Sequence, residues 1–200
     1  MKYALKEWST TIEALGKGQI VAVWRKGSVQ NKPGVKKPFE SFNIEQNKVV
    51  LFPTFTHQNF DDIKKEFWAL HDQNTGPNKD NQITIKYWAE VEEEIEVETI
   101  DQLLNASSEL VNSDEHLVSS WNLYPDHKGK ILFLRIYLLS DPILITNSDG
   151  YIGSKSWIEL NINVPKIGSK AILSFKDFSE KIRLVKALLE QAPAPQTVVV

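Results

Sequence analysis

The periods of apolar residues along the chain predict an alternating set of helices and strands. Leu5, Trp8, Ile12 and Leu15 recur at helical spacing, whereas residues 83–89 alternate between apolar and polar side chains, as a half-buried strand does. The same reasoning predicts helices over residues 5–15, 60–70, 99–104, 114–122 and 174–189, and strands over 19–24, 49–52, 83–89, 131–139, 143–145 and 158–164, with the acidic run 90–98 as an edge strand.

Helix breakers and strand breakers divide these elements without marking a boundary between domains. Pro53 is expected to end the strand before it or to lie at a sheet edge, and Asp141-Pro142 is expected to break the long apolar strand. We therefore predict one α+β domain over residues 1–190, with a mixed, mostly antiparallel sheet or partial barrel flanked by helices. The Pro-containing residues 191–200 are predicted to be a disordered tail.

The stretch 49–58 joins a buried apolar run to polar side chains. Thr54, His57 and Gln58 follow the predicted strand end, a position where a rigid scaffold commonly presents functional groups. His57 is the candidate catalytic acid or base. The alternative is that the threonines cap a turn and His57 hydrogen-bonds to the backbone.

Composition narrows the classes of function. A formal net charge of -3 argues against coating nucleic acid or anionic membrane through total charge, so any such contact has to be local. The absence of cysteine excludes disulfides, thiolate zinc sites and cysteine nucleophiles. The four histidines show no paired metal spacing, and we find no glycine-rich phosphate loop, so no metal or cofactor is predicted. Neither a signal peptide nor a membrane-spanning run is found, which predicts a cytoplasmic protein without a membrane partner.

Cationic and aromatic side chains stand at several predicted strand ends, where one end of the sheet could gather them. Cations neutralise phosphates and a Trp face accepts a stacked base, so the cluster predicts a site for nucleic acid or a nucleotide. The alternative is that the Trp is core, that Lys155 is solvated and that Arg135 pairs with a carboxylate such as Glu7. The predicted anion-binding or nucleic-acid-binding residues are Arg25, Lys26, Gln58, Arg135, Lys155 and Trp157.

Two further patterns have little support as metal-dependent sites. The run 89–95 resembles the acidic part of a Nudix box but lacks its flanking glycines and arginine. Nuclease sites of the restriction type need an acid-x-Lys tripeptide on a strand, whereas Asp62-Ile-Lys64 falls on a predicted helix and Asp126-His-Lys128 in a loop.

Five ordered motifs stand within residues 3–165: Ala4-Leu-Lys-Glu-Trp8, Arg25-Lys-Gly27, Leu51-Phe-Pro-Thr54 with His57-Gln58, Arg135-Ile-Tyr137, and Tyr151 through Lys155-Ser-Trp157. Together they resemble family eighteen-hundred-and-two of the domains of unknown function. The resemblance implies a bacterial family common in cyanobacteria, with some members associated with a restriction-endonuclease-like domain. Ser28 and Ser154 depart from the family pattern, and the second departure counts against a cysteine-dependent mechanism.

These observations lead to three hypotheses of different classes. The first is a non-catalytic module that binds nucleic acid or a nucleotide and serves a restriction or defence system. The second is a hydrolase or nuclease acting on a phosphorylated substrate, with His57 as acid or base. The third is a structural protein that binds a protein partner.

Overall fold

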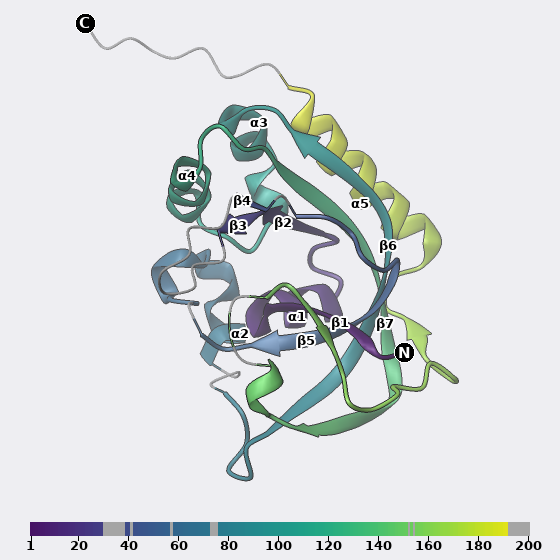
Figure 1. Ribbon diagram of the computed structural model, residues 1–200. Helices are drawn as coiled ribbons and strands as arrows, with labels where there is room; N and C mark the ends of the chain where they lie inside the picture. Colours follow the sequence, from purple (N-terminus) through teal and green to yellow (C-terminus); the bar gives the residue numbers. More distant parts are fainter. Residues whose placement is uncertain are drawn as a thin grey trace, which may run out of the picture.

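The protein folds around one curled, mixed sheet, as predicted for an α+β domain (Figure 1). The computed structural model describes residues 1–29, 39–40, 42–56, 58–72, 76–151, 153 and 155–191. The strands of the sheet lie in the order β2-β7-β6-β5-β1-β8, with β9 paired to β7. Their bounds are β1 Tyr3–Trp8, β2 Ala22–Lys26, β5 Lys48–Thr54, β6 Gln82–Val97, β7 Gly129–Thr146, β8 Trp157–Glu159 and β9 Lys170–Ala171.

A small second sheet and a set of helices complete the described part of the chain. β3 (Ser28–Val29) pairs with β4 (Phe39–Glu40) beside the end of β2. None of the helices in the described residues is long and apolar enough to cross a membrane. The helices are α1 Ser9–Gly16, α2 Trp68–Asp72, α3 Ile100–Asn105, α4 Asp114–Leu123 and α5 Phe175–Leu189, with 3-10 turns η1 Phe60–Asp62 and η2 Lys65–Phe67.

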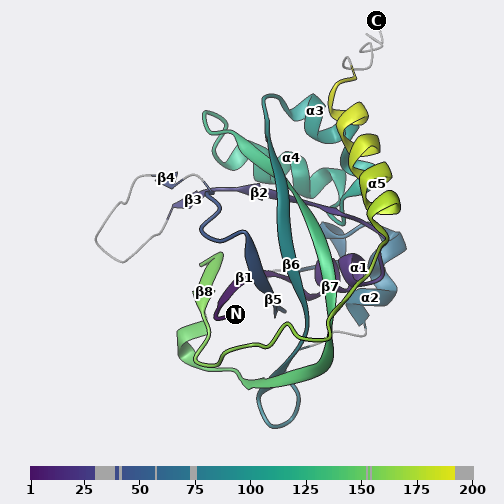
Figure 2. The same ribbon diagram turned by 90° about the vertical axis from the view of Figure 1, so that its right-hand side faces the viewer.

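The two faces of the sheet are covered by different elements (Figure 2). α1 lies on the concave face, where Ile12 and Leu15 pack with Val23, Leu132 and Leu134. On the convex face, α3, α4 and α5 cover one half around Phe133 and Phe178. A third buried cluster, with Trp88, Leu139, Tyr151 and Leu160, lies in the other half of the molecule. The long strands β6 and β7 are therefore buried on parts of both faces.

The first element is a strand followed by a helix, so the predicted helix over 5–15 is wrong in its first half. Residues 4–8 pair in parallel with residues 50–54 of β5, and Ala4 and Leu5 are fully buried on opposite faces. A strand buried on both faces carries no alternation that the sequence could reveal. The helical spacing of Leu5 and Trp8 with Ile12 is thus a coincidence of the pattern.

The predicted helix over 60–70 is also broken. Asn59 and Asp62 form a capping box around η1, and Ile63 then turns extended and bridges to Asn112. A true α-helix begins only at Trp68. Asp62 is thereby brought beside the segment that leads into α4.

Both prolines that were expected to stop strands are accommodated. β7 runs through Asp141-Pro142 because the register with β6 shifts there, from Tyr87↔Leu138 to Ile85↔Ile143, so the extra residues of β7 need no ladder partner. Pro53 lies within β5 but beyond the last β5–β6 pair, Val50↔Trp88. On that side β5 is an edge, as one of the two predicted outcomes required.

The sheet curls until β2, at one end of it, comes close to β1 near the other end. We call the contact between these two strands, at Arg25 and Glu7, the seam. β2 ends one side of the sheet, and β1 with β8 ends the other. Arg25 of β2 pairs with Glu7 of β1, and its guanidinium also donates to the Lys6 carbonyl. Side chains, rather than backbone pairs, therefore close this partial barrel.

Candidate functional site

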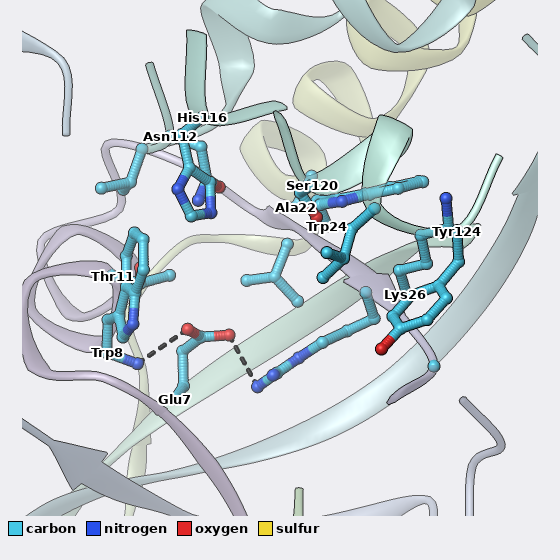
Figure 3. A pocket seen from close by; sticks show the side chains of 15 residues that line it. Glu7, Trp8, Thr11, Ala22, Trp24, Lys26, Asn112, His116, Ser120 and Tyr124 are labelled. Carbon is cyan, nitrogen blue, oxygen red and sulfur yellow. Dashed lines mark hydrogen bonds and ion pairs between the residues drawn. The ribbon is translucent and has the colours of Figure 1, made fainter. Parts of the chain in front are cut away.

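A hollow of about 190 Å³ lies at the seam, and we call it the seam pocket (Figure 3). Three segments that are distant in the sequence contribute to it: the β1–α1 junction, the whole of β2, and residues 111–124 around α4. Figure 3 shows Trp8, Glu7 and His116 on one side of the hollow and Trp24, Lys26 and Tyr124 on the other. The pocket thus combines charged, aromatic and hydroxyl-bearing side chains.

Glu7 and Arg25 form the floor of this pocket. The Arg25 Nη2 atom lies 2.7 Å from Glu7 Oε2, and the side chains are only 17% and 11% exposed. The other carboxylate oxygen, Glu7 Oε1, accepts the Trp8 N–H at 2.7 Å. Two hydrogen bonds to one partly buried carboxylate fix its position, and with it the position of the guanidinium.

His116 lines the pocket wall and is hydrogen-bonded to Asp62 behind it. His116 lies in the first turn of α4, where Ser113 accepts its backbone N–H at 3.2 Å, and its Nδ1 atom lies 3.0 Å from Asp62 Oδ1. Burial raises the pKa of Asp62, but hydrogen bonds from His116 and Asn59 outweigh burial and bring the pKa below its ordinary value. The carboxylate is therefore ionised at neutral pH.

The orientation of the His116 ring follows from these contacts. The Trp8 ring meets it edge-on with centroids 4.9 Å apart. Since a carboxylate holds Nδ1, the Nε2 atom is the ring nitrogen left for a ligand in the pocket, an arrangement typical of acid–base histidines.

Lys26 contributes a cation from the opposite side of β2. Its Nζ atom donates to the Trp121 carbonyl at 2.6 Å and lies 4.9 Å from the centre of the Trp121 ring. Burial lowers the pKa of Lys26. The Trp24 ring stacks on Trp121 at 6.0 Å, so two indoles support this lysine.

A second hollow of about 230 Å³ lies on the other side of Arg25. Phe42, His127, Lys128 and Lys130 line it, together with the carboxylates of Glu96 and Asp126. The Arg25 guanidinium lies 5.7 Å from the Phe42 ring centre, and that ring stacks on Trp157 at 5.7 Å. Arg25 therefore separates two adjoining hollows that both have aromatic walls.

Comparison with known families agrees with the motifs. The family model described as "Domain of unknown function (DUF1802)" matches residues 4–183. The chain belongs to this family. No curated protein matches it.

Two solved structures resemble this DUF1802 chain at low identity. Both are crystal structures of mutants of the ZmASCH protein from Zymomonas mobilis, each 11% identical in sequence. They cover 91% of this chain and 94% or 96% of their own, with TM-scores of 0.38 and 0.43. Since both TM-scores are below 0.5, the likeness does not establish a shared fold.

Four of the predicted site residues lie at or beside the seam of the DUF1802 chain. Arg25 and Lys26 line the seam pocket, and Trp157 meets Arg25 through the Phe42 ring. Lys155 is exposed and precedes Ser156, whose carbonyl accepts the Lys6 N–H at 2.8 Å; burial lowers the pKa of Lys6, and the charge of Lys155 lowers it further. The predicted gathering of cations and aromatic rings is thus present in part.

Arg135 does not join them, and the expectation that it lies at the same sheet end is wrong. Val23 and Arg25 are on the concave face, whereas Phe133 and Arg135 of β7 are on the convex face. The alternative partner was also wrong, because Glu7 pairs with Arg25. Side chains two residues apart lie on the same face of one strand. The sequence does not reveal whether side chains on two different strands lie on the same face of the sheet.

The polar residues after β5 were predicted to contribute to the site, but Gln58 lies elsewhere. Gln58 is buried and binds the start of α1: its amide nitrogen donates to Ser9 Oγ at 2.9 Å, and its oxygen accepts from Thr10 Oγ1 at 3.3 Å. These bonds occupy the side chain in a structural role. His57 lies outside the described residues.

Sequence reasoning missed His116 and Tyr124, and it considered Asp62 only as part of the Asp62-Ile-Lys64 tripeptide. The sequence places His116 in a predicted helix and Asp62 in a different one, and nothing in the spacing of 54 positions links them. Apart from His57, no histidine was a candidate, because the four show no paired metal spacing. Among the described residues, no group of three His, Cys, Asp or Glu side chains could hold a metal ion.

Proposed function

We propose that the seam pocket binds a nucleotide or one unit of a single-stranded nucleic acid. The observation that carries this proposal is the position of Arg25, a fixed guanidinium between two hollows that are both walled by aromatic rings. Guanidinium groups bind phosphate oxygens, and aromatic faces stack with bases of any sequence. The site therefore offers complementary groups for both parts of a nucleotide.

The volume of the seam pocket favours single-stranded nucleic acid over a duplex. The seam pocket of about 190 Å³ is smaller than the ~300–1,000 Å³ typical of sites for drug-sized ligands, so it accommodates one base or one phosphate. The second hollow continues past Arg25 and provides room for the next unit of the same strand. Carboxylates in that hollow limit the net positive charge, so we expect modest affinity that depends on salt.

Binding to a fluorescein-labelled single-stranded 12-mer, followed by fluorescence anisotropy over a salt series, tests the proposal. Replacing Lys155 by Gln removes an exposed cation beside the seam, and we expect affinity to fall about two- to threefold with a shallower salt dependence. Trp8→Leu removes a half-buried aromatic wall of the pocket. We expect it to weaken binding about fivefold or more, because base stacking is worth ~1–3 kcal/mol.

Lys79→Gln is the matched control. It removes the same charge from an exposed turn before Gln82, whereas the pocket lies near the other end of β6, where Val97 pairs with Gly129 beside Lys26. Unchanged affinity is expected for Lys79→Gln. Equal losses for the control and Lys155→Gln would refute a local site, and no binding by the parent protein would refute the proposal and favour a protein partner.

An acid–base enzyme is the second candidate, because His116 is paired with an ionised carboxylate at the pocket wall. Such a histidine can accept a proton from a nucleophile through Nε2 while Asp62 stabilises the cation. We expect His116→Asn to retain oligonucleotide binding and to abolish any hydrolysis of that oligonucleotide. Retained hydrolysis in this variant would exclude the role of His116.

Two further expectations from the sequence stay predictions. We expect the protein to work in the cytoplasm, as the absence of cysteine permits. The link to restriction or defence systems comes from family resemblance alone, and a ligand identified at the seam pocket would give it a chemical basis.

A further inference from the structure

Arg135 lies in an unusual setting on the convex face of the sheet. It is half-buried between the cluster around Phe133 and the cluster that includes Trp88 and Tyr137. The charge is too enclosed to be solvated as fully as a surface arginine, so its hydrogen-bond donors need acceptors.

The described residues provide no acceptor for its guanidinium. No carboxylate in the described part of the chain lies within ion-pair distance, and the buried Nε atom has no hydrogen-bond partner. Glu90 faces Arg135 across the β6–β7 pair, but its carboxylate is bound to Lys48 Nζ at 3.0 Å. An arginine with unused donors is a preformed binding fork for an oxyanion.

Aromatic rings hold the guanidinium in place instead. Its central carbon lies 5.7 Å from the centre of the Tyr137 ring and 5.4 Å from that of Phe175, at the start of α5. Tyr137 stacks on Trp88 with centroids 4.0 Å apart, and Lys166 lies over Trp88 at 5.7 Å. Contacts with ring faces orient a cation without using its N–H groups.

The neighbouring surface adds an apolar part to this fork. Phe175 is 67% exposed even though its ring contacts Arg135, so one face of the ring is available to a ligand. Lys166 adds a second cation on the same side. The ligand that fits is one that combines an oxyanion with an aromatic or apolar group.

We propose that Arg135 and Phe175 form a binding site for an oxyanion, a phosphate or a carboxylate, carried on an aromatic or apolar molecule. This site is separate from the seam pocket because Arg25 and Arg135 lie on opposite faces of the sheet. It does not depend on the function proposed for that pocket. It also explains why a charged residue stands in the segment 131–139, where every other side chain is apolar or aromatic.

The arginine side-chain Nε–Hε signals in an NMR spectrum test this proposal directly. The chain has three arginines, Arg25, Arg135 and Arg183, so each signal can be assigned with one variant. We expect titration with phenyl phosphate or benzoate to shift the Arg135 signal and to leave the exposed Arg183 unchanged, whereas any shift of Arg25 reports the seam pocket and is fitted separately. The stronger of the two probes identifies a phosphate or a carboxylate as the preferred group.

Two variants separate the contributions of the fork and the ring. Arg135→Lys keeps the charge but loses the fork, and we expect about tenfold weaker binding. Phe175→Ala is expected to reduce the affinity for phenyl phosphate to that for inorganic phosphate. Thermal unfolding and the oligonucleotide titration show whether each variant keeps its fold and its seam pocket. No shift at Arg135 with either probe, or an equal shift at exposed Arg183, would overturn the proposal.

Discussion

At the level of single residues, Arg25 accounts for both the closure of the sheet and the character of the pocket. It reaches from β2 to β1, where it binds the Glu7 carboxylate and the Lys6 carbonyl. Because both charged groups are largely withdrawn from solvent, each depends on the other for compensation. The ion pair is therefore part of the fold as well as part of the proposed site.

Replacing Glu7 by Gln tests this dependence. We expect the free energy of unfolding to fall by about 2–3 kcal/mol, because the guanidinium stays partly buried without its carboxylate. Urea unfolding measures the change. Glu98→Gln, which breaks an exposed pair with Lys128, is expected to cause no measurable loss. Equal losses in the two variants would contradict a special role for the seam.

The Asp62–His116 pair predicts how stability changes in acid. The pKa of Asp62 in the folded protein is below its ordinary 3.8, so the unfolded chain takes up the proton first as the pH falls. The stabilisation is therefore present above pH 3.8 and is lost as the pH falls through the lower folded value.

Asp62→Asn removes this contribution. We expect the variant to be less stable than the parent protein above pH 4, with a difference that narrows in more acidic solution. Urea midpoints over a pH series measure it, and Asp61→Asn serves as the exposed neighbouring control. A difference that is constant with pH would show that Asp62 is not stabilised as an anion.

At the level of elements, the pocket wall depends on the close approach of β2 to the start of β7. Gly129 pairs with Lys26, and a Cβ atom added at Gly129 would lie 2.0 Å from the Trp24 ring. The absence of a side chain at this position lets the Trp24 indole stack on Trp121 beside the pocket.

Gly129→Ala is therefore expected to displace Trp24 and to lower the free energy of unfolding by about 1–3 kcal/mol. Chemical denaturation followed by tryptophan fluorescence reports both effects. Gly150→Ala is the matched control, since its nearest contact would be an ordinary 3.8 Å to Ser148 Oγ. A stable Gly129→Ala protein with unchanged fluorescence would contradict this packing.

Elements with a local signal could be predicted from the sequence. The Thr99 capping box begins α3, Ser113 caps α4 and Ser174 caps α5, each close to the expected residue. The first strand and the break at Ile63 could not be predicted, because both depend on partners distant in the sequence, residues 50–54 and Asn112. Pairing with distant segments overrides the local secondary-structure propensity of these residues.

The candidate site shows the same division. Cations and indoles at strand ends were recognisable in Arg25, Lys26 and Trp157, whereas their faces and partners were not. Arg135 was expected at the same sheet end as these residues, and its face could not be predicted because residues 131–139 are apolar on both faces of the strand. The Asp62–His116 hydrogen bond forms only because the predicted helix over 60–70 is interrupted, and no feature of the sequence predicted that interruption.

At the level of the whole molecule, the curled sheet separates two surfaces of different character. The seam joins both edges of the sheet around Arg25, and the convex face presents Arg135 between Tyr137 and Phe175. Although the net charge is -3, each surface has a fixed guanidinium group, and these are the two places where we propose that anions bind. Ligands at the two sites should therefore bind independently.

The six tryptophans allow one measurement to locate nucleic acid on the molecule. Trp8 and Trp24 line the seam pocket and Trp157 lies beside it, whereas Trp68 binds the Phe60 and Ile63 carbonyls and Trp88 lies under Lys166 on the other surface. We would titrate the protein with an unlabelled single-stranded oligonucleotide and follow the indole Nε1–H signals by NMR. The account predicts shifts of Trp8, Trp24 and Trp157 with Trp68 and Trp88 unchanged. Shifts confined to Trp68 or Trp88, or no shift at any indole, would contradict it.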